Sequence, residues 1–253
     1  MFFLRFLLVF ATCFSLSAQP CINDPSPRSR VGRLVFKEDF NDSVFTEDWL
    51  FRSDRRFRKI PFESLSIQVM NLVYLNYGFC FLKTRTTQEP FTFFGSGLIS
   101  RRFFKNGFFE CRLRLPSTPG IHTSFWLMKN PSHFDWNKIF IEIDIMEHDS
   151  GDSYYTTNVH YHKEPASRLG PRRVFFKQEK QVFRLFGLLL DDKQAHFFLD
   201  GALVHTYTFD SWRSSESNIW ISAIGWPLNK VFFRPNEELD VAVFDFVYVY
   251  SLN

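Results

Sequence analysis

The chain has 253 residues, of which 45% are hydrophobic, and its formal net charge is +3. This length and hydrophobic content are sufficient for one substantial core. The net charge is too small to indicate a nucleic-acid partner, and we expect none.

The N-terminal segment has the features of a secretory signal peptide. One early charge, Arg5, is followed by an apolar run and then by the small residues Ser15, Ser17 and Ala18. We predict a signal peptide over residues 1–18. An uncleaved anchor is the alternative, although the apolar run is short for a membrane span. We therefore expect an exported protein, secreted or (in a bacterium) periplasmic, without a membrane span after cleavage.

Residues 19–31 carry three prolines and no periodicity, and they predict a linker. Many short runs of strand character follow, separated by Gly, Pro, Asn, Asp and Ser. Asp200–Gly201 predicts a hairpin turn between two of them. No long stretch shows a helical repeat, so we predict one all-β domain, a sandwich or jelly roll. The expected strands lie within residues 33–40, 66–77, 78–85, 107–116, 139–148, 154–162, 182–190, 194–209, 217–227 and 239–252.

Three cysteines follow the predicted signal peptide, namely Cys21, Cys80 and Cys111. Because Cys80 and Cys111 lie inside strand-like runs, they could pair across a sheet. The alternative is two buried thiols that act as small apolar residues.

The strand-like segment IEIDIMEHDS, residues 141–150, contains three acids near its centre. Side chains alternate across a strand, so Glu142 and Asp144 share one face. A regular period would place Glu147 on the apolar face, where a charge is costly. One extra residue, a β-bulge at about Ile145–Met146, would return Glu147 to the acidic face. The sequence therefore predicts a bulge at that point.

Three carboxylates on one face repel one another, and a purely structural strand gains nothing from them. Glycoside hydrolysis uses such a set, because one carboxylate attacks the anomeric carbon while a second protonates the leaving oxygen. Four strand steps separate Cα atoms by about 13 Å, and two Glu side chains that lean together leave about 5 Å between carboxylates. That separation predicts retention of configuration. The alternative is a solvated acidic strand edge without chemistry.

The segment EIDIME, residues 142–147, resembles the signature of glycoside hydrolase family 16 in the β-bulged form of laminarinases and agarases. Similarity continues over about residues 34–251, in segments such as TSFWLM, TTNVHYH and DVAVFDFVYVY. The resemblance implies a concanavalin-like β-jelly-roll sandwich of two antiparallel sheets with a concave substrate cleft. It places this catalytic domain over residues 32–253.

The resemblance also implies a role for each acid. Glu142 would be the nucleophile and Glu147 the general acid/base. Asp144 would hydrogen-bond the nucleophile and tune the pKa values of both glutamates.

Five further residues match positions that line the cleft in the family. Aromatic rings suit this role because sugar rings present apolar C–H faces. Core packing is the alternative for Trp126, Trp220 and Trp226. The expected substrate-binding residues are Trp126, Trp136, His160, Trp220 and Trp226.

We expect no required cofactor. His160 and His162 are two apart on one strand face, so a metal pair is conceivable, but no third ligand stands at a suitable spacing. Some family members bind structural calcium through an Asp of the closing strand, and Asp245 occupies that position. Calcium needs several oxygen ligands, and Asp245 is the one credible side chain.

Some positions depart from the family pattern. His122 stands where laminarinases usually have a Trp, and another Trp is replaced near Leu190. These changes weaken the assignment to a standard β-1,3-glucanase. Several arginines are expected near the cleft, where they would meet sulfated or acidic sugars or form a solvated surface. They are Arg101, Arg102, Arg168, Arg172 and Arg173.

The residues and the resemblance together indicate a monomeric, exported, retaining endo-β-glycanase that hydrolyses a β-1,3-glucan or a β-galactan. One alternative is a carbohydrate-binding protein of the same fold that has lost catalysis. Another is a transglycosylase, in which a sugar replaces water as the acceptor.

Overall fold

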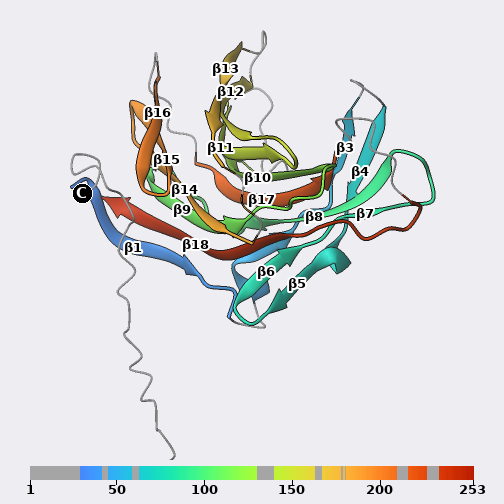
Figure 1. The fold of residues 1–253 in the computed structure, drawn as a ribbon. Helices are drawn as coiled ribbons and strands as arrows, with labels where there is room; N and C mark the ends of the chain where they lie inside the picture. Colours follow the sequence, from blue (N-terminus) through green and yellow to red (C-terminus); the bar gives the residue numbers. More distant parts are fainter. Residues whose placement is uncertain are drawn as a thin grey trace, which may run out of the picture.

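Two β-sheets packed face to face form the described part of the chain (Figure 1). The structure is a computed structural model, and it describes residues 29–41, 45–58, 63–129, 140–162, 167–177, 179, 181–209, 216–226 and 234–253. The predicted signal peptide, most of the predicted linker, Cys21 and Trp136 lie outside these residues. Within them, no helix is long and apolar enough to cross a membrane.

The smaller sheet has eight strands, in the order β16-β15-β14-β9-β18-β6-β5, with β1 paired to β18. All of its pairings are antiparallel. Its strands are β1 (Val31–Glu38), β5 (Val73–Asn76), β6 (Phe79–Leu82), β9 (Gly107–Arg114), β14 (Phe183–Leu190), β15 (Gln194–Leu199), β16 (Ala202–Thr208) and β18 (Ala242–Leu252).

The larger sheet has ten strands, in the order β13-β12-β11-β10-β17-β8-β4-β3, with β2 and β7 paired to β8. Its pairings are antiparallel except that β4 and β8 are parallel. Its strands are β2 (Trp49–Phe51), β3 (Arg55–Arg58), β4 (Ser64–Gln68), β7 (Arg85–Thr86), β8 (Thr92–Ser100), β10 (Ile121–Met128), β11 (Phe140–Asp149), β12 (Tyr154–His162), β13 (Ser167–Phe175) and β17 (Asn218–Gly225). Two short 3-10 turns, Phe45–Glu47 and Met70–Leu72, complete the described elements.

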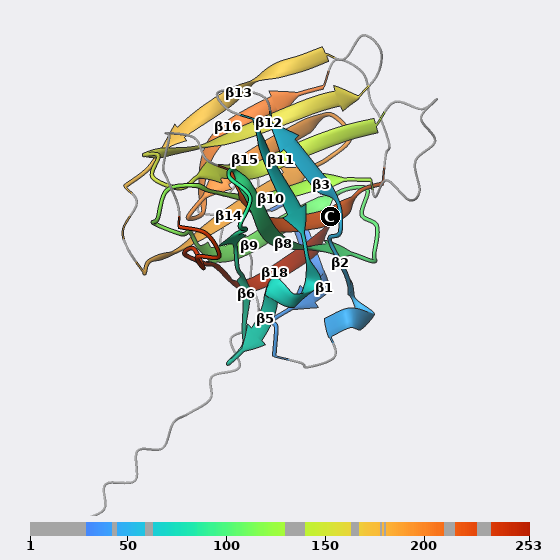
Figure 2. The ribbon, with the colours of Figure 1, turned by 90° about the vertical axis from the view of Figure 1, so that its right-hand side faces the viewer.

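The larger sheet is bowed. Figure 1 shows β12 and β13 rising at one side and β3 and β4 at the other, with β10 and β17 lying low between them. Figure 2, turned by 90°, shows β13, β12, β11 and β10 side by side in that order. The smaller sheet covers the outer side of the bow. The predicted all-β sandwich of two antiparallel sheets is therefore confirmed, and one parallel pair is added to it.

The main hydrophobic core lies between the sheets. Strand alternation supplies it: Phe109, Cys111 and Leu113 face it from β9, and Ile141 and Ile143 face it from β11. Because alternate side chains of β11 from Ile141 to Ile145 are held in this core, the residues between them are directed to the concave side. The core thus fixes which face of β11 is open to a ligand.

Two sequence predictions about local structure can be compared with the fold. The hairpin turn is confirmed, since β15 and β16 pair through Asp200 and Gly201, whose φ angles are +49° and +81°. Glycine suits the second position because it adopts positive φ without steric cost. Cys80 and Cys111 are free, buried thiols, so the disulfide alternative is wrong. Val31, which ends the predicted linker, already belongs to β1.

Candidate active site

Strand β11 contains the predicted bulge. Asp144 pairs with Asn158 of β12 and Glu147 pairs with Thr156, so three steps on β11 match two on β12. Ile145 and Met146 are consecutive residues, and both belong to the buried core, with 1% and 0% of their surfaces exposed. This one-residue slip keeps Glu147 on the same face as Asp144.

Glu142, Asp144 and Glu147 of β11 open into one cleft of about 560 Å³ on the concave side. Glu142 and Glu147 are partly accessible, with 16% and 30% of their side chains exposed, whereas Asp144 is 2% exposed. Two glutamates can therefore reach a ligand, and the aspartate between them lies in the cleft floor. The other lining residues are Arg52, Arg56, Phe57, His122, Ser124, Trp126, His160, Tyr161, His162, Ile224 and Trp226.

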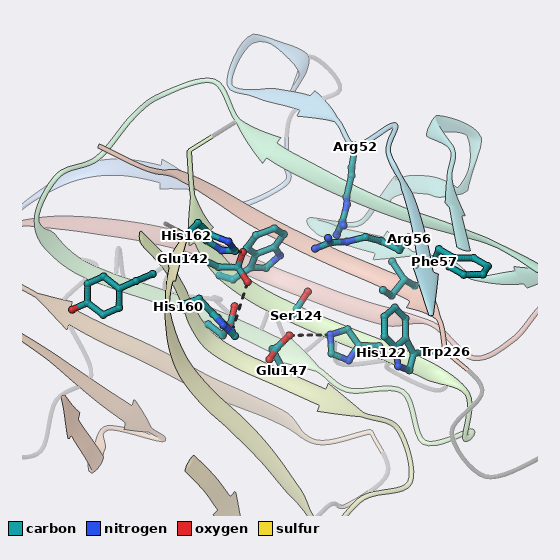
Figure 3. A pocket seen from close by; sticks show the side chains of 14 residues that line it. Arg52, Arg56, Phe57, His122, Ser124, Glu142, Glu147, His160, His162 and Trp226 are labelled. Atoms are coloured by element: carbon teal, nitrogen blue, oxygen red, sulfur yellow. Dashed lines mark hydrogen bonds and ion pairs between the residues drawn. The ribbon is translucent and has the colours of Figure 1, made fainter. Parts of the chain in front are cut away.

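Each acid has a histidine neighbour from an adjacent strand. On β12, His162 Nε2 lies 3.0 Å from Glu142 Oε2, and His160 Nε2 lies 2.8 Å from Asp144 Oδ2. On β10, His122 Nε2 lies 3.3 Å from Glu147 Oε1. Figure 3 shows Glu142 beside His160 and His162, and Glu147 beside His122. Glu142 and Asp144 thus form one group with histidines of β12, and Glu147 forms another with His122 of β10.

In the group around Glu147, the pKa values of Glu147 and His122 are shifted in opposite directions. Burial raises the pKa of Glu147, but the hydrogen bond and charge of His122, followed by the charge of His160, outweigh burial and hold the pKa below its usual value. Burial lowers the pKa of His122, yet the Asp149 and Glu147 carboxylates overcome this effect and raise it to about 10. At neutral pH this group therefore consists of a carboxylate beside an imidazolium.

The opposite wall of the cleft carries a buried guanidinium. Arg52, only 2% exposed, donates from Nε and Nη2 to the two carboxylate oxygens of Asp54, at 2.5 and 3.0 Å. Its Nη1 donates to Ser222 Oγ at 2.8 Å. Burial lowers the pKa of Arg52, and Asp54 opposes that shift. Arg56 lies beside it, and Figure 3 shows both side chains reaching over the cleft.

The predicted tryptophan platforms have different positions. Trp126 lines the cleft but is 3% exposed, because the guanidinium groups of Arg52 and Arg56 lie 5.6 and 5.9 Å from its ring centre. Trp220 is also 3% exposed and packs against Trp126, with ring centres 4.7 Å apart and ring planes tilted by 31°, and it is not among the lining residues. Trp226 lines the cleft and packs against the ring of His122 at 5.5 Å.

The structure therefore brings Trp126, Trp226 and His160 to the cleft with the three acids. It places Trp220 in a buried cluster with Ile99, Trp126 and Met128, which is the core alternative given for it. Trp136 falls outside the described residues, so its role stays a prediction.

Two metal positions were considered from the sequence, the pair His160 and His162 and the residue Asp245. Among the described residues, Glu142, Asp144 and His160 form the one group of three with ligand atoms within 4.8 Å of one another. Within this group, His160 Nε2 lies 2.8 Å from Asp144 Oδ2 and 3.9 Å from Glu142 Oε1. Asp245, on the strand β18 of the outer sheet, forms a salt bridge with Arg112. Calcium binding at Asp245 stays an untested expectation.

Sequence reasoning missed the arginines of the cleft. Arg52 and Arg56 line it, whereas Arg101, Arg102, Arg172 and Arg173 do not. The segment FRSDRRFR alternates Arg52, Asp54 and Arg56 with period 2, which was the available signal. His162 was considered only as a metal ligand, and His122 only as a departure from the family. Their contacts depend on strand pairing, which the local sequence does not show.

The sequence and the fold were compared with protein families, curated proteins and solved structures. The sequence matches the family model described as Glycosyl hydrolases family 16 over residues 58–230. No curated protein matches the chain. Among solved structures, it is similar to a laminarinase from Flavobacterium sp. UMI-01, with a TM-score of 0.70 and 19% identity over 87% of this chain and 100% of that one.

Two further solved structures give similar values. Porphyranase B from Zobellia galactanivorans has a TM-score of 0.70 and 17% identity, covering 85% of this chain and 90% of that one. The endo-β-1,3-glucanase from Pyrococcus furiosus has a TM-score of 0.69 and 21% identity, covering 87% of this chain and 95% of that one. At these identities the similarity establishes the fold.

Proposed function

The chain belongs to glycosyl hydrolases family 16, and from this premise we propose that it is an endo-acting β-glycanase that cleaves its polysaccharide with retention of configuration. One observation carries the proposal. Glu142, Asp144 and Glu147 share the floor of one cleft, although a strand bulge stands between the second and the third. A structural strand does not need three like charges on one face, whereas a double displacement needs two carboxylates facing the same glycosidic bond.

In the first half of the proposed reaction, the Glu142 carboxylate attacks the anomeric carbon. The bond between that carbon and the leaving oxygen breaks, and Glu147 gives its proton to this oxygen. A covalent glycosyl ester on Glu142 and a free sugar hydroxyl result. Both side chains are accessible enough to meet a sugar, at 16% and 30% exposed.

In the second half, water attacks the same carbon and Glu147 takes its proton. The ester bond to Glu142 breaks and the carboxylate is regenerated. Two successive inversions leave the configuration unchanged, so a β-linked substrate gives a β product.

Asp144 acts through its neighbours in this scheme. It is almost fully buried between the two glutamates along β11, and His160 contacts it at 2.8 Å. The same His160 nitrogen lies 3.9 Å from Glu142 Oε1. In this proposal Asp144 and His160, at the floor of the cleft, together orient the nucleophile Glu142. A charge-assisted hydrogen bond of this type is worth about 1.5–3 kcal/mol.

The similar structures and the cleft support a proposal about the substrate class. The structural neighbours include a laminarinase and a porphyranase, so we propose a β-1,3-glucan or a β-galactan. Arg52 and Arg56 cover the tryptophan that would otherwise form an open platform. This arrangement favours polar contacts with the sugar over ring stacking at that point. We also propose that residues 1–18 direct export of the protein.

A polysaccharide panel tests the proposed activity. Laminarin, lichenan, agarose, carrageenan, porphyran and xyloglucan are incubated with the protein, and new reducing ends are measured. We expect a falling polymer length and new reducing ends on a β-1,3-glucan or a β-galactan. Binding without cleavage of any polymer would contradict the proposal and favour a carbohydrate-binding protein. When short oligosaccharides are added as acceptors, products longer than these acceptors would indicate transglycosylation.

Glu142→Gln tests the proposed nucleophile on the polymer that the panel identifies. The amide keeps the shape of the side chain but cannot form the ester, so we expect turnover to fall by at least about a thousandfold. Glu89→Gln, an exposed residue outside the cleft, is the matched control and should keep wild-type turnover. Wild-type turnover by Glu142→Gln would show that the assignment is wrong.

A further inference from the structure

His122 lies between two carboxylates at the edge of the cleft. On the paired strands β10 and β11, His122 stands directly opposite Asp149, and Ser124 stands opposite Glu147. Glu147 is therefore the diagonal neighbour of His122, a distance that a long side chain can span. His122 Nδ1 is 2.8 Å from Asp149 Oδ1, and Nε2 is 3.3 Å from Glu147 Oε1.

The contacts of the two ring nitrogens define the charge of His122. Both face carboxylate oxygens, and an ionised carboxylate only accepts hydrogen bonds. A neutral imidazole has one N–H, whereas the imidazolium has two and can donate to both partners. The ring is enclosed, with 16% of the side chain exposed and Trp226 packed against it. While both carboxylates are ionised, the geometry thus fits the charged form.

The other strands packed around Glu147 and His122 add few charges. From β12, His160 adds a second positive influence on Glu147. From β17, the residue opposite His122 is the apolar Ile224. On β11 itself, Asp149 is the opposing negative charge, and His148 is buried.

The remaining charges of the cleft lie further along it. Glu142 and Asp144 are grouped with His162 and His160. Arg52 and Arg56 line the same cleft from the opposite wall, where Asp54 is their carboxylate partner. His122 is thus a charged group in direct contact with Glu147.

We propose that His122, anchored by Asp149, is a positioning residue that orients the acid/base Glu147 and holds a positive charge against it, which confines cleavage to acidic conditions. The proposal rests on the proposed function, because it concerns the proton that Glu147 must donate. It also gives a role to a residue that stands where the family resemblance leads us to expect Trp. An indole could not place a charge against Glu147.

The direction of the pH effect follows from the protonation state that each step needs. The first half of the reaction requires protonated Glu147, so its rate falls as the pH rises through the pKa of Glu147. The ion pair holds this pKa below its usual value, so the decline begins at a lower pH than it would without His122. When the charge at position 122 is removed, the alkaline limb of the profile should move to higher pH.

The first test measures His122 without any substrate. Nitrogen-detected NMR of the imidazole should show both nitrogens of His122 protonated from pH 5 to pH 8 in the wild type. In Glu147→Gln one of the two carboxylates is gone, so the apparent pKa of His122 should fall by about one unit or more. A neutral His122 at pH 7, or an unchanged titration in Glu147→Gln, would overturn the proposal. This result is independent of whether the protein cleaves any polymer.

The second test measures kcat/KM against pH on the polymer identified by the panel. His122→Gln keeps polar atoms but no charge, and its alkaline limb should lie about one pH unit or more above that of the wild type. His122→Arg restores a charge and should return the limb toward the wild-type position. His205→Gln, on β16 outside the cleft, is the matched control and should leave the profile unchanged. An alkaline limb at the same pH in His122→Gln and the wild type would contradict the proposal.

Discussion

At the residue scale, the cleft consists of carboxylate–histidine pairs contributed by different strands. Glu142 is paired with His162, Asp144 with His160, and Glu147 with His122. Each pair reduces the repulsion that three acids on one face would otherwise produce. The pairs differ in exposure, since Asp144 is buried whereas Glu142 and Glu147 reach the open cleft. This difference agrees with reacting roles for the glutamates and a supporting role for the aspartate.

Asp144→Asn tests that supporting role. The amide removes the negative charge facing His160 at 2.8 Å, and the lost charge-assisted contact is worth about 1.5–3 kcal/mol. We expect kcat to fall about 10- to 100-fold, with a circular dichroism spectrum like that of the wild type. Initial rates and a thermal melt check the result. A variant with wild-type kcat would remove Asp144 from the mechanism.

At the element scale, the bulge of β11 decides which side chains meet. With Ile145 and Met146 both in the core, Glu147 stays in the cleft and pairs with Thr156. On the other side, Phe125 pairs with Met146 and Trp126 with Asp144, so Ile145 is the additional residue on β11. Removing Ile145 would leave these cross-strand pairs in place and restore a regular alternation.

Deleting a residue at the bulge and inserting one should therefore have different effects on cleavage. Deleting Ile145 keeps Glu147 on the cleft face and loses one buried side chain, at a cost of about 1.5–3 kcal/mol. We expect this variant to fold with a lower melting temperature and to keep measurable cleavage. Inserting one Ala after Ile145 turns Glu147 toward the core, where its charge is costly, so cleavage should disappear. Thermal melts and reducing-end assays compare the deletion and insertion variants. An insertion variant that cleaves the polymer would contradict the conclusion that the bulge keeps Glu147 in the cleft.

At this scale, the sequence showed how side chains alternate along each strand. The slip at Ile145–Met146 and the turn at Asp200–Gly201 could be predicted because each depends on neighbouring residues. The contact between His122 and Glu147 could not, because it depends on the register between β10 and β11. For Trp220 the sequence left core and cleft positions open, because the choice depends on the register between β10 and β17.

At the scale of the whole molecule, the bowed sheet provides the cleft and the second sheet supports it. Strands β12–β13 and β3–β4 form the two sides, and the shared core lies beneath β10 and β11. Cys80 and Cys111 are fully buried in that core, in strands on either side of β18. Burial raises the pKa of both thiols, so they are unreactive in the folded state.

Thiol labelling should therefore report on opening of the sandwich. In the Cys21→Ser protein lacking residues 1–18, we expect no labelling of Cys80 or Cys111 at pH 8 without denaturant. Both should react together as urea unfolds the protein, because both belong to one core. Mass spectrometry after a timed pulse counts the labelled thiols. Rapid labelling of either cysteine in the native protein would contradict a closed core.

The central claim is that Glu142 attacks the sugar and that Glu147 donates and accepts the proton. It is tested most directly by the configuration of the azide adduct formed from an activated aryl β-glycoside, measured by NMR. Glu142→Ala leaves space for azide to attack from the opposite face, so we expect an α-glycosyl azide. Glu147→Ala still forms the ester on Glu142, so azide should give a β-glycosyl azide. The same configuration from both variants, or the reverse pattern, would contradict the assignment.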